Sequence, residues 1–384
     1  MKYCNLLIIL FLFGMLACTG EKKEGFSHEL VKSDKKKSFS LDDNTRYNAF
    51  YLYTFNDNRG KEYLSFLNYR SNQILFYDFE TGDFQFKTEM NREGADGISL
   101  ISGYYIKDFD NMYVTSYDFP GIIKIDTSEH IVQKIPYGTT SQGYTIVPSY
   151  APSSRPFIPP VFVGDKLFIT QIPADHIYPA AKTPVSVSID TLNGTSEEYP
   201  FTFGQALADL QQNKETRFSR TFNGKNFIYS FYADENIYVA SIDHKEILKV
   251  NAKSKYIDAV KFKSPPEDAN LAVKHSLETA CYGDLIYDKY RDVYYRFVYP
   301  ETELEDNKQW IGNALFGRKK FSIIILDNKF NRIGETLFPE AIYNSYVFFI
   351  HKDGLYISSD YQINYDQPED AINFELFRLT KNES

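Results

Sequence analysis

A short apolar strand that ends at a polar turn residue recurs six times along this chain. The six runs are Ile74–Tyr77, Ile122–Ile125, Val185–Ile189, Ile247–Val250, Ile323–Leu326 and Leu376–Leu379, followed by Asp78, Asp126, Asp190, Asn251, Asp327 and Thr380. In the stretch 282–339 the run is the third of four strand-like segments, which are Asp284–Asp288, Val293–Tyr299, Phe321–Leu326 and Ile333–Phe338. Four-stranded antiparallel sheets repeated around an axis form a β-propeller. The sequence therefore predicts an all-β fold, a six-bladed β-propeller of four-stranded antiparallel blades.

The spacing of the runs predicts long inserted loops. Their last residues lie 48, 64, 61, 76 and 53 positions apart, which excludes an even array of the WD40 kind. Short helices are predicted within two insertions, Gln205–Arg217 and Pro265–Cys281, from the spacing of their apolar residues. The fourth strand of the third unit is expected at Glu198–Phe203, and the fourth unit is expected to begin with Phe227–Tyr232 and to end with Tyr256–Phe262. A two-sheet sandwich or two stacked β domains is the alternative architecture for so many short strands.

The sixth blade lacks one strand when the chain is read in order. Its segments are Tyr346–His351, Gly354–Ser358 and Phe374–Leu379, after which the chain stops at Ser384. A bare sheet edge invites aggregation, so a fourth strand is expected. The candidate is Lys37–Leu41, whose polarity alternates and which has no other partner. We expect this N-terminal strand to lie beside Phe374–Leu379 and to close the ring.

Composition supports strands and argues against a nucleic-acid partner. The chain holds 31 Tyr and 32 Phe, and aromatic residues are enriched in strands. The formal net charge is −9, and Lys35–Lys37 is the strongest basic run. Nucleic-acid binding needs a basic surface, so we expect no nucleic-acid partner.

The N-terminus reads as a lipoprotein export signal. Lys2 precedes the apolar run Leu6–Leu16, which is too short to span a bilayer and ends in Leu16-Ala17-Cys18. This ending resembles the bacterial lipobox, in which the cysteine is lipidated and becomes the mature N-terminus. We predict a signal peptide over residues 1–17, a flexible tether over 18–35 after lipidated Cys18, and a single domain over 36–384. A simple signal peptide with a chance cysteine is the alternative.

The stretch from Tyr287 to Phe297, Tyr-Asp-Lys-Tyr-Arg-Asp-Val-Tyr-Tyr-Arg-Phe, resembles a pattern of Bacteroidetes lipoproteins of the DUF4221 kind. That family is related to six-bladed β-propeller lipoproteins. The resemblance implies a propeller and an outer-membrane lipoprotein, periplasmic or surface-facing. It implies no established activity, so no catalytic residue can be transferred.

The candidate ligand-binding residues are arginines, tyrosines and one histidine. Arginine beside aromatic rings can bind a carboxylate or a sugar face. The candidates are Arg155, Arg217, Arg220, Tyr290, Arg291, Tyr295, Arg296 and His351. The structural alternative for Arg291 and Arg296 is a salt bridge between blades with Asp288 or Asp292. Arg155, Arg217 and Arg220 would form a pocket if their loops met, and otherwise are unrelated surface charges.

Motifs for cofactors, metals and nucleophilic catalysis are missing from the sequence. No histidine pair has zinc spacing, and no G-x-S-x-G elbow, P-loop or dinucleotide fingerprint occurs. We therefore expect no metal and no cofactor, catalytic residues stay unassigned, and Cys281 is expected to be a small buried apolar residue. The sequence favours a binding module for a glycan, a peptide or an envelope protein. A hydrolase or lyase acting on polysaccharide at the channel face is the alternative.

Overall fold

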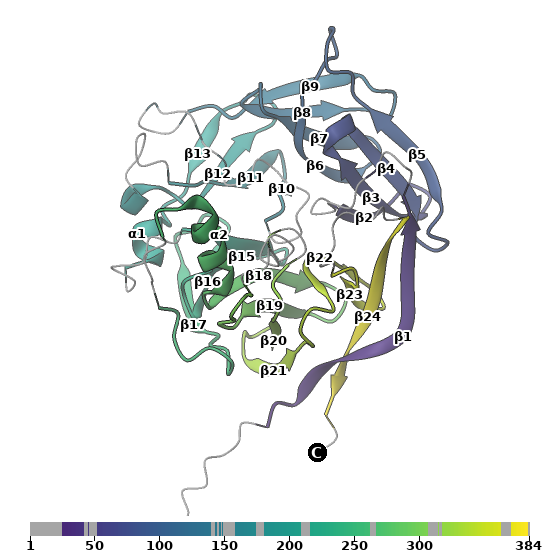
Figure 1. The fold of residues 1–384 in the computed structure, drawn as a ribbon. Coiled ribbons are helices and arrows are strands. Elements are labelled where there is room, and N and C mark those ends of the chain that lie inside the picture. The colour runs from purple at the N-terminus through teal and green to yellow at the C-terminus, as the bar shows by residue number, and fades with distance from the viewer. Residues whose placement is uncertain are drawn as a thin grey trace, which may run out of the picture.

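The computed structural model describes residues 25–41, 52–139, 158–173, 180–208, 216–261, 266–305, 317–361 and 370–382, and isolated positions 45, 143, 146, 148 and 314. Within these residues the chain forms 24 strands, all in antiparallel ladders apart from one parallel bridge. Figure 1 shows the sheets set around a common centre, with β5, β9, β13, β17 and β21 at the periphery. No helix of the described part is long and apolar enough to cross a bilayer.

Four of the sheets have four strands each, taken in chain order. Unit one is β2 (Leu52–Asn56), β3 (Glu62–Asn68), β4 (Gln73–Asp78) and β5 (Phe84–Glu89), with the 3₁₀ turn η1 (Tyr69–Ser71). Unit two is β6 (Ile101–Asp108), β7 (Asn111–Ser116), β8 (Gly121–Ile125) and β9 (Ile131–Pro136). Unit three is β10 (Val161–Val163), β11 (Lys166–Thr170), β12 (Ser186–Asp190) and β13 (Ser196–Glu198), with η2 (Ala180–Lys182). Unit four is β14 (Phe218–Phe222), β15 (Asn226–Phe231), β16 (Asn236–Ser241) and β17 (Ile247–Asn251).

The fifth sheet has eight strands and contains two units joined through the N-terminal strand. Unit five is β18 (Cys281–Asp288), β19 (Val293–Tyr299), β20 (Ser322–Leu326) and β21 (Arg332–Leu337). Unit six is β22 (Asn344–His351), β23 (Gly354–Ser358), β24 (Ala371–Lys381) and β1 (His28–Ser40). A single parallel bridge, His28 to Gly334, connects β1 to β21 and merges the two units.

The predicted pairing of the two ends of the chain is confirmed. Lys37 lies opposite Phe374 and Phe39 lies opposite Ile372 in an antiparallel register. Strand β1 begins at His28, so the expected tether over 18–35 is wrong for residues 28–35, which form strand. These residues pair with the far end of β24, after a register shift between Lys32 and Lys36. The predicted signal peptide and Cys18 lie outside the described residues.

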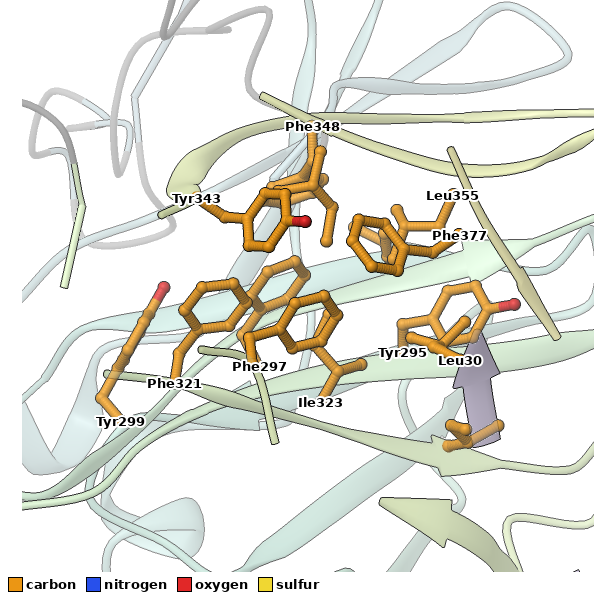
Figure 2. Close-up of a cluster of buried hydrophobic side chains, with 14 of the residues drawn as sticks. Leu30, Tyr295, Phe297, Tyr299, Phe321, Ile323, Tyr343, Phe348, Leu355 and Phe377 are labelled. Atoms are coloured by element: carbon orange, nitrogen blue, oxygen red, sulfur yellow. The ribbon is translucent and has the colours of Figure 1, made fainter. Parts of the chain in front are cut away.

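Six hydrophobic clusters form the core, and each lies between two consecutive units. The cluster between units five and six contains Phe297, Phe321 and Phe348, whose rings are stacked with centroids 4.4–5.9 Å apart (Figure 2). The cluster between units six and one contains Phe39 and Phe374. The other four clusters join units one and two, two and three, three and four, and four and five. Every unit is therefore packed on both faces, which makes the arrangement cyclic.

The predicted strand order is wrong in unit four. Phe227–Tyr232 was expected as its first strand, but β14 precedes it and β15 is the second strand. The segment predicted as its last strand, Tyr256–Phe262, is irregular from 256 to 261. In unit three the fourth strand was expected at Glu198–Phe203. Strand β13 ends at Glu198, although backbone hydrogen bonds to Ser186 and Val185 and a bridge from Pro184 to Thr202 continue the pairing. The Thr202 hydroxyl then accepts the Gln205 amide in a capping box that begins α1.

The two helices of the described chain lie in connections between units. Helix α1 (Phe203–Ala206) begins two residues before the predicted segment Gln205–Arg217, whose residues 209–215 lie outside the described part. Helix α2 (Ala269–Glu278) lies within the predicted segment Pro265–Cys281 and is N-capped by Asp268. The helix predicted within Pro265–Cys281 is therefore confirmed, whereas α1 overlaps the predicted segment Gln205–Arg217 only at Gln205 and Ala206.

The first strands of neighbouring units run in the same direction. Ser219 at the start of β14 bonds to Leu285, while Asn223 after its end bonds to Tyr294 beside the end of β18. We call the end of the ring where β14, β18 and β22 begin the loop end. We call the opposite end, where first and second strands are joined by tight turns, the hairpin end. Helix α2 connects β17 to β18 at the loop end.

Gly82 marks the closest approach of β1 to unit one. It has φ +80°, and a Cβ there would lie 2.1 Å from the Ser38 carbonyl oxygen. Gly60 has the same backbone conformation, φ +82°, with open space around it. Alanine at either position adds about 1–2 kcal/mol of left-handed strain. We expect Gly82→Ala to lower the unfolding free energy by about 1–3 kcal/mol more than Gly60→Ala, because overpacking displaces β1. Urea unfolding measures the difference, and equal effects would contradict this contact.

A buried carboxylate holds both halves of β1 to β24. The ammonium nitrogens of Lys32 and Lys36 lie 2.6 and 2.9 Å from Glu375, and the Tyr343 hydroxyl donates to it at 2.7 Å. Burial alone would raise the pKa of Glu375, but these hydrogen bonds outweigh burial and lower the pKa to about 2.

The lowered pKa of Glu375 predicts an acid-sensitive contribution to stability. The carboxylate stabilises the fold above its unfolded pKa of about 4.3, and this contribution is lost as the pH falls toward 2. Glu375→Gln should lower the unfolding free energy by roughly 1–3 kcal/mol at pH 7. The deficit should shrink between pH 5 and pH 2 in urea titrations, whereas a deficit independent of pH would exclude this role.

Candidate functional site

The ligand-binding residues expected from the sequence do not all lie in one place. Tyr290, Arg291 and His351 lie at the hairpin end, in or beside the turns that follow β18 and β22. Arg217 precedes β14 and lies at the loop end. Arg155 lies outside the described residues. The expected pocket of Arg155, Arg217 and Arg220 therefore cannot be traced within the described chain and stays a prediction.

Arg291 and His351 connect units at the hairpin end. Arg291 Nε lies 2.5 Å from the Asp288 carboxylate, and its other nitrogens donate to the carbonyls of His351 and Lys352 in unit six. Arg291 forms the expected ion pair with Asp288, but this pair lies within unit five, and the link between units is made by the hydrogen bonds to the carbonyls of His351 and Lys352. The His351 imidazole lies 3.1 Å from Glu62 of unit one. Tyr290 is 46% exposed and is the most accessible candidate at this end.

Tyr295 and Arg296 lie inside the protein. Tyr295 is fully buried in the cluster between units five and six, and its hydroxyl donates to Asp288 at 3.3 Å. Arg296 is fully buried, and its guanidinium lies 3.8 Å from the centroid of Tyr282. All its nitrogens donate, to the Ser230 hydroxyl and to the carbonyls of Asp234, Glu235, Asn236 and Ala252. Arg296 thus fastens unit five to the β15–β16 turn, without the salt bridge to Asp288 or Asp292 expected as its structural alternative.

Arg220 has a similar place between units three and four. It is 1% exposed, and its terminal nitrogens donate to the carbonyls of Pro159 and Phe168 and to the Ser186 hydroxyl. Burial lowers the pKa of its guanidinium. Its position in β14, with the side chain directed into unit three, places it in the packing between units.

A different group of polar side chains gathers at the loop end, across units four, five and six. We call it the arginine–tyrosine cluster. Its members are Arg217, Tyr232, Asp284, Tyr299, Arg318 and Tyr346. They come from the start of β18 and β22, the ends of β15 and β19, and the segments before β14 and β20. Since these positions all fall at one end of the ring, the side chains of three units meet there.

Tyr232 contacts both Asp284 and Arg217 of the cluster. Its hydroxyl donates to the Asp284 carboxylate at 2.6 Å, and the Arg217 guanidinium lies 5.4 Å from its ring centroid. Asp284 is 3% exposed, whereas Arg217 is exposed. Arg217 is thus the solvent-exposed member of this part of the cluster, beside a half-buried tyrosine and a buried carboxylate.

Arg318 is the buried cation of the cluster. It is 5% exposed and its guanidinium lies 5.2 Å from the Tyr299 ring. One terminal nitrogen donates to the carbonyls of Leu277 and Thr279, and the other to the Cys281 sulfur at 3.4 Å. Cys281 is a free, buried thiol, as the sequence predicted. Figure 2 shows Tyr299 at the margin of the phenylalanine stack, where the core meets this cluster.

Burial keeps the tyrosines of the cluster in their neutral form. It raises the pKa of Tyr232 and Tyr299 well above the usual value, and the nearby Asp284 carboxylate raises both further. Burial also raises the pKa of Tyr346, although Arg318 opposes this rise. The cluster therefore offers hydroxyl donors beside two guanidinium groups, which suits a ligand rich in hydrogen-bond acceptors.

Glycoside hydrolysis uses two carboxylates, and Asp284 is the one carboxylate among the members named above. Among the described residues, no group of three or more His, Cys, Asp or Glu side chains could hold a metal.

The chain matches the model of a family described as a domain of unknown function, DUF4221, over residues 27–337. It belongs to the DUF4221 family. A solved DUF4221 structure from Bacteroides vulgatus ATCC 8482 is similar, with a TM-score of 0.79, 24% identity, and 93% of this chain and 99% of that chain covered. This likeness shows that the DUF4221 fold is shared.

Weaker likenesses involve other solved proteins. Virginiamycin B lyase from Staphylococcus aureus has a TM-score of 0.41 and 12% identity, covering 89% of this DUF4221 chain and 99% of that chain. A PQQ-bound aldose sugar dehydrogenase from Streptomyces coelicolor has a TM-score of 0.42 and 12% identity, covering 91% and 100%. A comparison with curated proteins gave no match.

Only Arg217 of the arginine–tyrosine cluster was among the sequence candidates. The other members of this DUF4221 cluster are separated by up to 114 residues, from Tyr232 to Tyr346. Arg318 follows Gly317 in a long connection without a motif, so no local pattern indicates its place. The order of the strands could have indicated the cluster. In such a ring, the ends of the second strands and the starts of the first strands of all units lie at the same end.

Proposed function

We propose that this DUF4221 chain is a lipid-anchored, six-bladed β-propeller of the bacterial outer membrane that binds a glycan or a peptide at the arginine–tyrosine cluster. Six hydrophobic clusters, each between consecutive four-strand units, support the blade count. The sequence Leu16-Ala17-Cys18 supports the anchor. No nucleic-acid partner is proposed, since the net charge is −9.

The observation that carries the binding proposal is the convergence of two guanidinium groups and three tyrosines at one end of the ring. Arginine recognises carboxylates and stacks on planar groups, while tyrosine offers an apolar face and a hydroxyl. Sugars and peptides present both kinds of surface. The cluster is also built from three units, so its geometry is held by the core beneath it.

A glycan array and a peptide array, probed with the purified full-length protein in detergent, test the proposal. Ligands found there are titrated against Arg217→Ala and against Lys352→Ala, the matched control. Lys352 is also an exposed cation, with 68% of its side chain accessible, but it lies at the hairpin end. We expect Arg217→Ala to weaken binding at least tenfold and Lys352→Ala to leave it unchanged. A folded protein that binds nothing on either array, or equal losses in both variants, would refute the proposed site.

A further inference from the structure

Arg318 is an incompletely satisfied buried cation. Its Nε has no hydrogen-bond partner, and no carboxylate of the described chain lies within ion-pair distance. One terminal nitrogen donates to the Cys281 sulfur, which is a weak acceptor, with the Tyr346 hydroxyl close to the same guanidinium. The nitrogens of Arg296 all donate, to a hydroxyl and four carbonyls, whereas the Nε of buried Arg220 also lacks a partner among the described residues. Burial of a cation is costly unless acceptors or a counter-charge surround it.

A second unpartnered donor lies on the adjoining segment. Asn344 is 1% exposed, and its side-chain oxygen accepts the backbone N–H of Tyr346 at 3.0 Å. This bond fixes the orientation of the amide, so Nδ2 is the group without a partner. The two segments are in contact, since the Arg318 N–H donates to the Ser345 hydroxyl at 3.0 Å and a Cβ on Gly317 would lie 3.2 Å from the Asn344 side-chain oxygen.

The Tyr299 hydroxyl adds a third donor beside Arg318. It lies near Ser345 but makes no hydrogen bond of good geometry. Buried polar groups in native proteins are almost always paired, so three under-used donors on segments in mutual contact point to an absent acceptor. A buried water could accept from such donors. Water would leave the charge of Arg318 without a counter-charge, and an anion supplies both.

We propose that Arg318, Asn344 and Tyr299 form a subsite for a small anionic group, a carboxylate, at the base of the arginine–tyrosine cluster. Arg318 supplies the positive charge and the Nε–H donor, and the Asn344 amide and the Tyr299 hydroxyl donate to the same group. This subsite would receive the acidic group of the bound ligand, a step that rests on the proposed function. The ligand class is then a glycan that carries a uronic acid or a peptide that presents a carboxylate.

Free acetate tests the subsite without the ligand. The melting temperature of the full-length protein is measured while acetate replaces MES, whose sulfonate is larger, at constant ionic strength. A parallel titration uses chloride in place of acetate. We expect the melting temperature to rise saturably with acetate in the wild type and in Lys352→Ala, and not in Arg318→Met or Asn344→Leu. A rise with chloride alone assigns the site to an inorganic anion and overturns the carboxylate subsite. The absence of a saturable rise in the wild type indicates a buried water and also overturns it.

A direct binding measurement tests the subsite even if Arg318→Met or Asn344→Leu fails to fold. Broadening of the ¹³C-acetate NMR signal by the wild type should be relieved by Tyr299→Phe, which removes one oxygen atom. Unchanged broadening would contradict the subsite. Amidation of the carboxylate of an array ligand should weaken its binding at least tenfold. An acetate effect without any array ligand would leave the subsite standing while the proposed function fails.

Discussion

Phe39→Ala is expected to lower the free energy of unfolding by about 3–5 kcal/mol, although Phe39 lies near the end of the described N-terminal strand. Its side chain is fully buried between units six and one, where it meets Tyr77 and Phe374 edge-on at 5.9 and 6.0 Å. Truncation leaves a cavity at the seam that β1 closes. The total free energy of unfolding of a domain is about 5–15 kcal/mol, so this loss would be a large part of it.

Phe84→Ala provides the matched control. Phe84 belongs to the edge strand β5 and is 47% exposed, but its ring meets Tyr77 edge-on at 5.7 Å, so its truncation should lower the unfolding free energy by only about 0.5–1.5 kcal/mol. Chemical unfolding of the two variants and the wild type measures the contrast. Similar small losses in both variants would mean that β1 is not an integral part of the ring.

Arg296→Met has the second large expected effect. The substitution keeps an unbranched side chain but removes donors to the carbonyls of Asp234, Glu235, Asn236 and Ala252. Each buried acceptor left without a partner costs about 1–3 kcal/mol, and water entry relieves part of this, so we expect a loss of roughly 3–5 kcal/mol. The β15–β16 turn should also become mobile, since Arg296 holds three of its carbonyls.

Arg378→Met is the control for this substitution. Arg378 also lies in a strand, β24, but is exposed, so its loss should be nearly neutral. Unfolding in urea gives the free energies, and amide hydrogen exchange reports on the turn at residues 232–236. A neutral Arg296→Met would show that its hydrogen bonds are replaceable, and the pairing of units four and five would then need another cause.

The sequence was most informative where strand counting applied. Lys37–Leu41 was placed beside β24 because a three-strand unit leaves an unpaired edge, and the register of Lys37 with Phe374 confirms this. The start of β1 was missed because residues 28–35 are rich in charged side chains. Their pairing with β24 is supported by the ion pairs of Lys32 and Lys36 with Glu375. Glu375 lies more than 300 residues away in the sequence, so no local pattern indicates these contacts.

Unit four shows why periodicity failed. Strand β14 has the sequence Phe-Ser-Arg-Thr-Phe. Its three central residues are polar, so the sequence does not look like a buried strand, although four of its five residues are buried. Ser219 and Arg220 are buried because they bond to neighbouring units, to Leu285 and to Pro159. Alternating polarity identifies strands with one solvated face, and a first strand packed on both faces need not alternate.

The candidate site was the least predictable feature. Arginine beside tyrosine was taken as a ligand signal at Arg291 and Arg296, yet both fasten units together. The arginines of the cluster, Arg217 and Arg318, lie in connections where no local pattern separates a ligand contact from a surface charge. Their meeting depends on the parallel arrangement of β14, β18 and β22, which is a property of the whole ring.

Amide hydrogen exchange with and without the ligand found on the arrays tests most directly which end of the ring is the binding site. The account predicts slower exchange on binding in residues 216–218, 277–284, 317–322 and 343–346, which carry Arg217, Asp284, Arg318 and Tyr346 of the arginine–tyrosine cluster. Protection confined to the turns at 289–292 and 351–354 would place the ligand at the hairpin end and contradict the account.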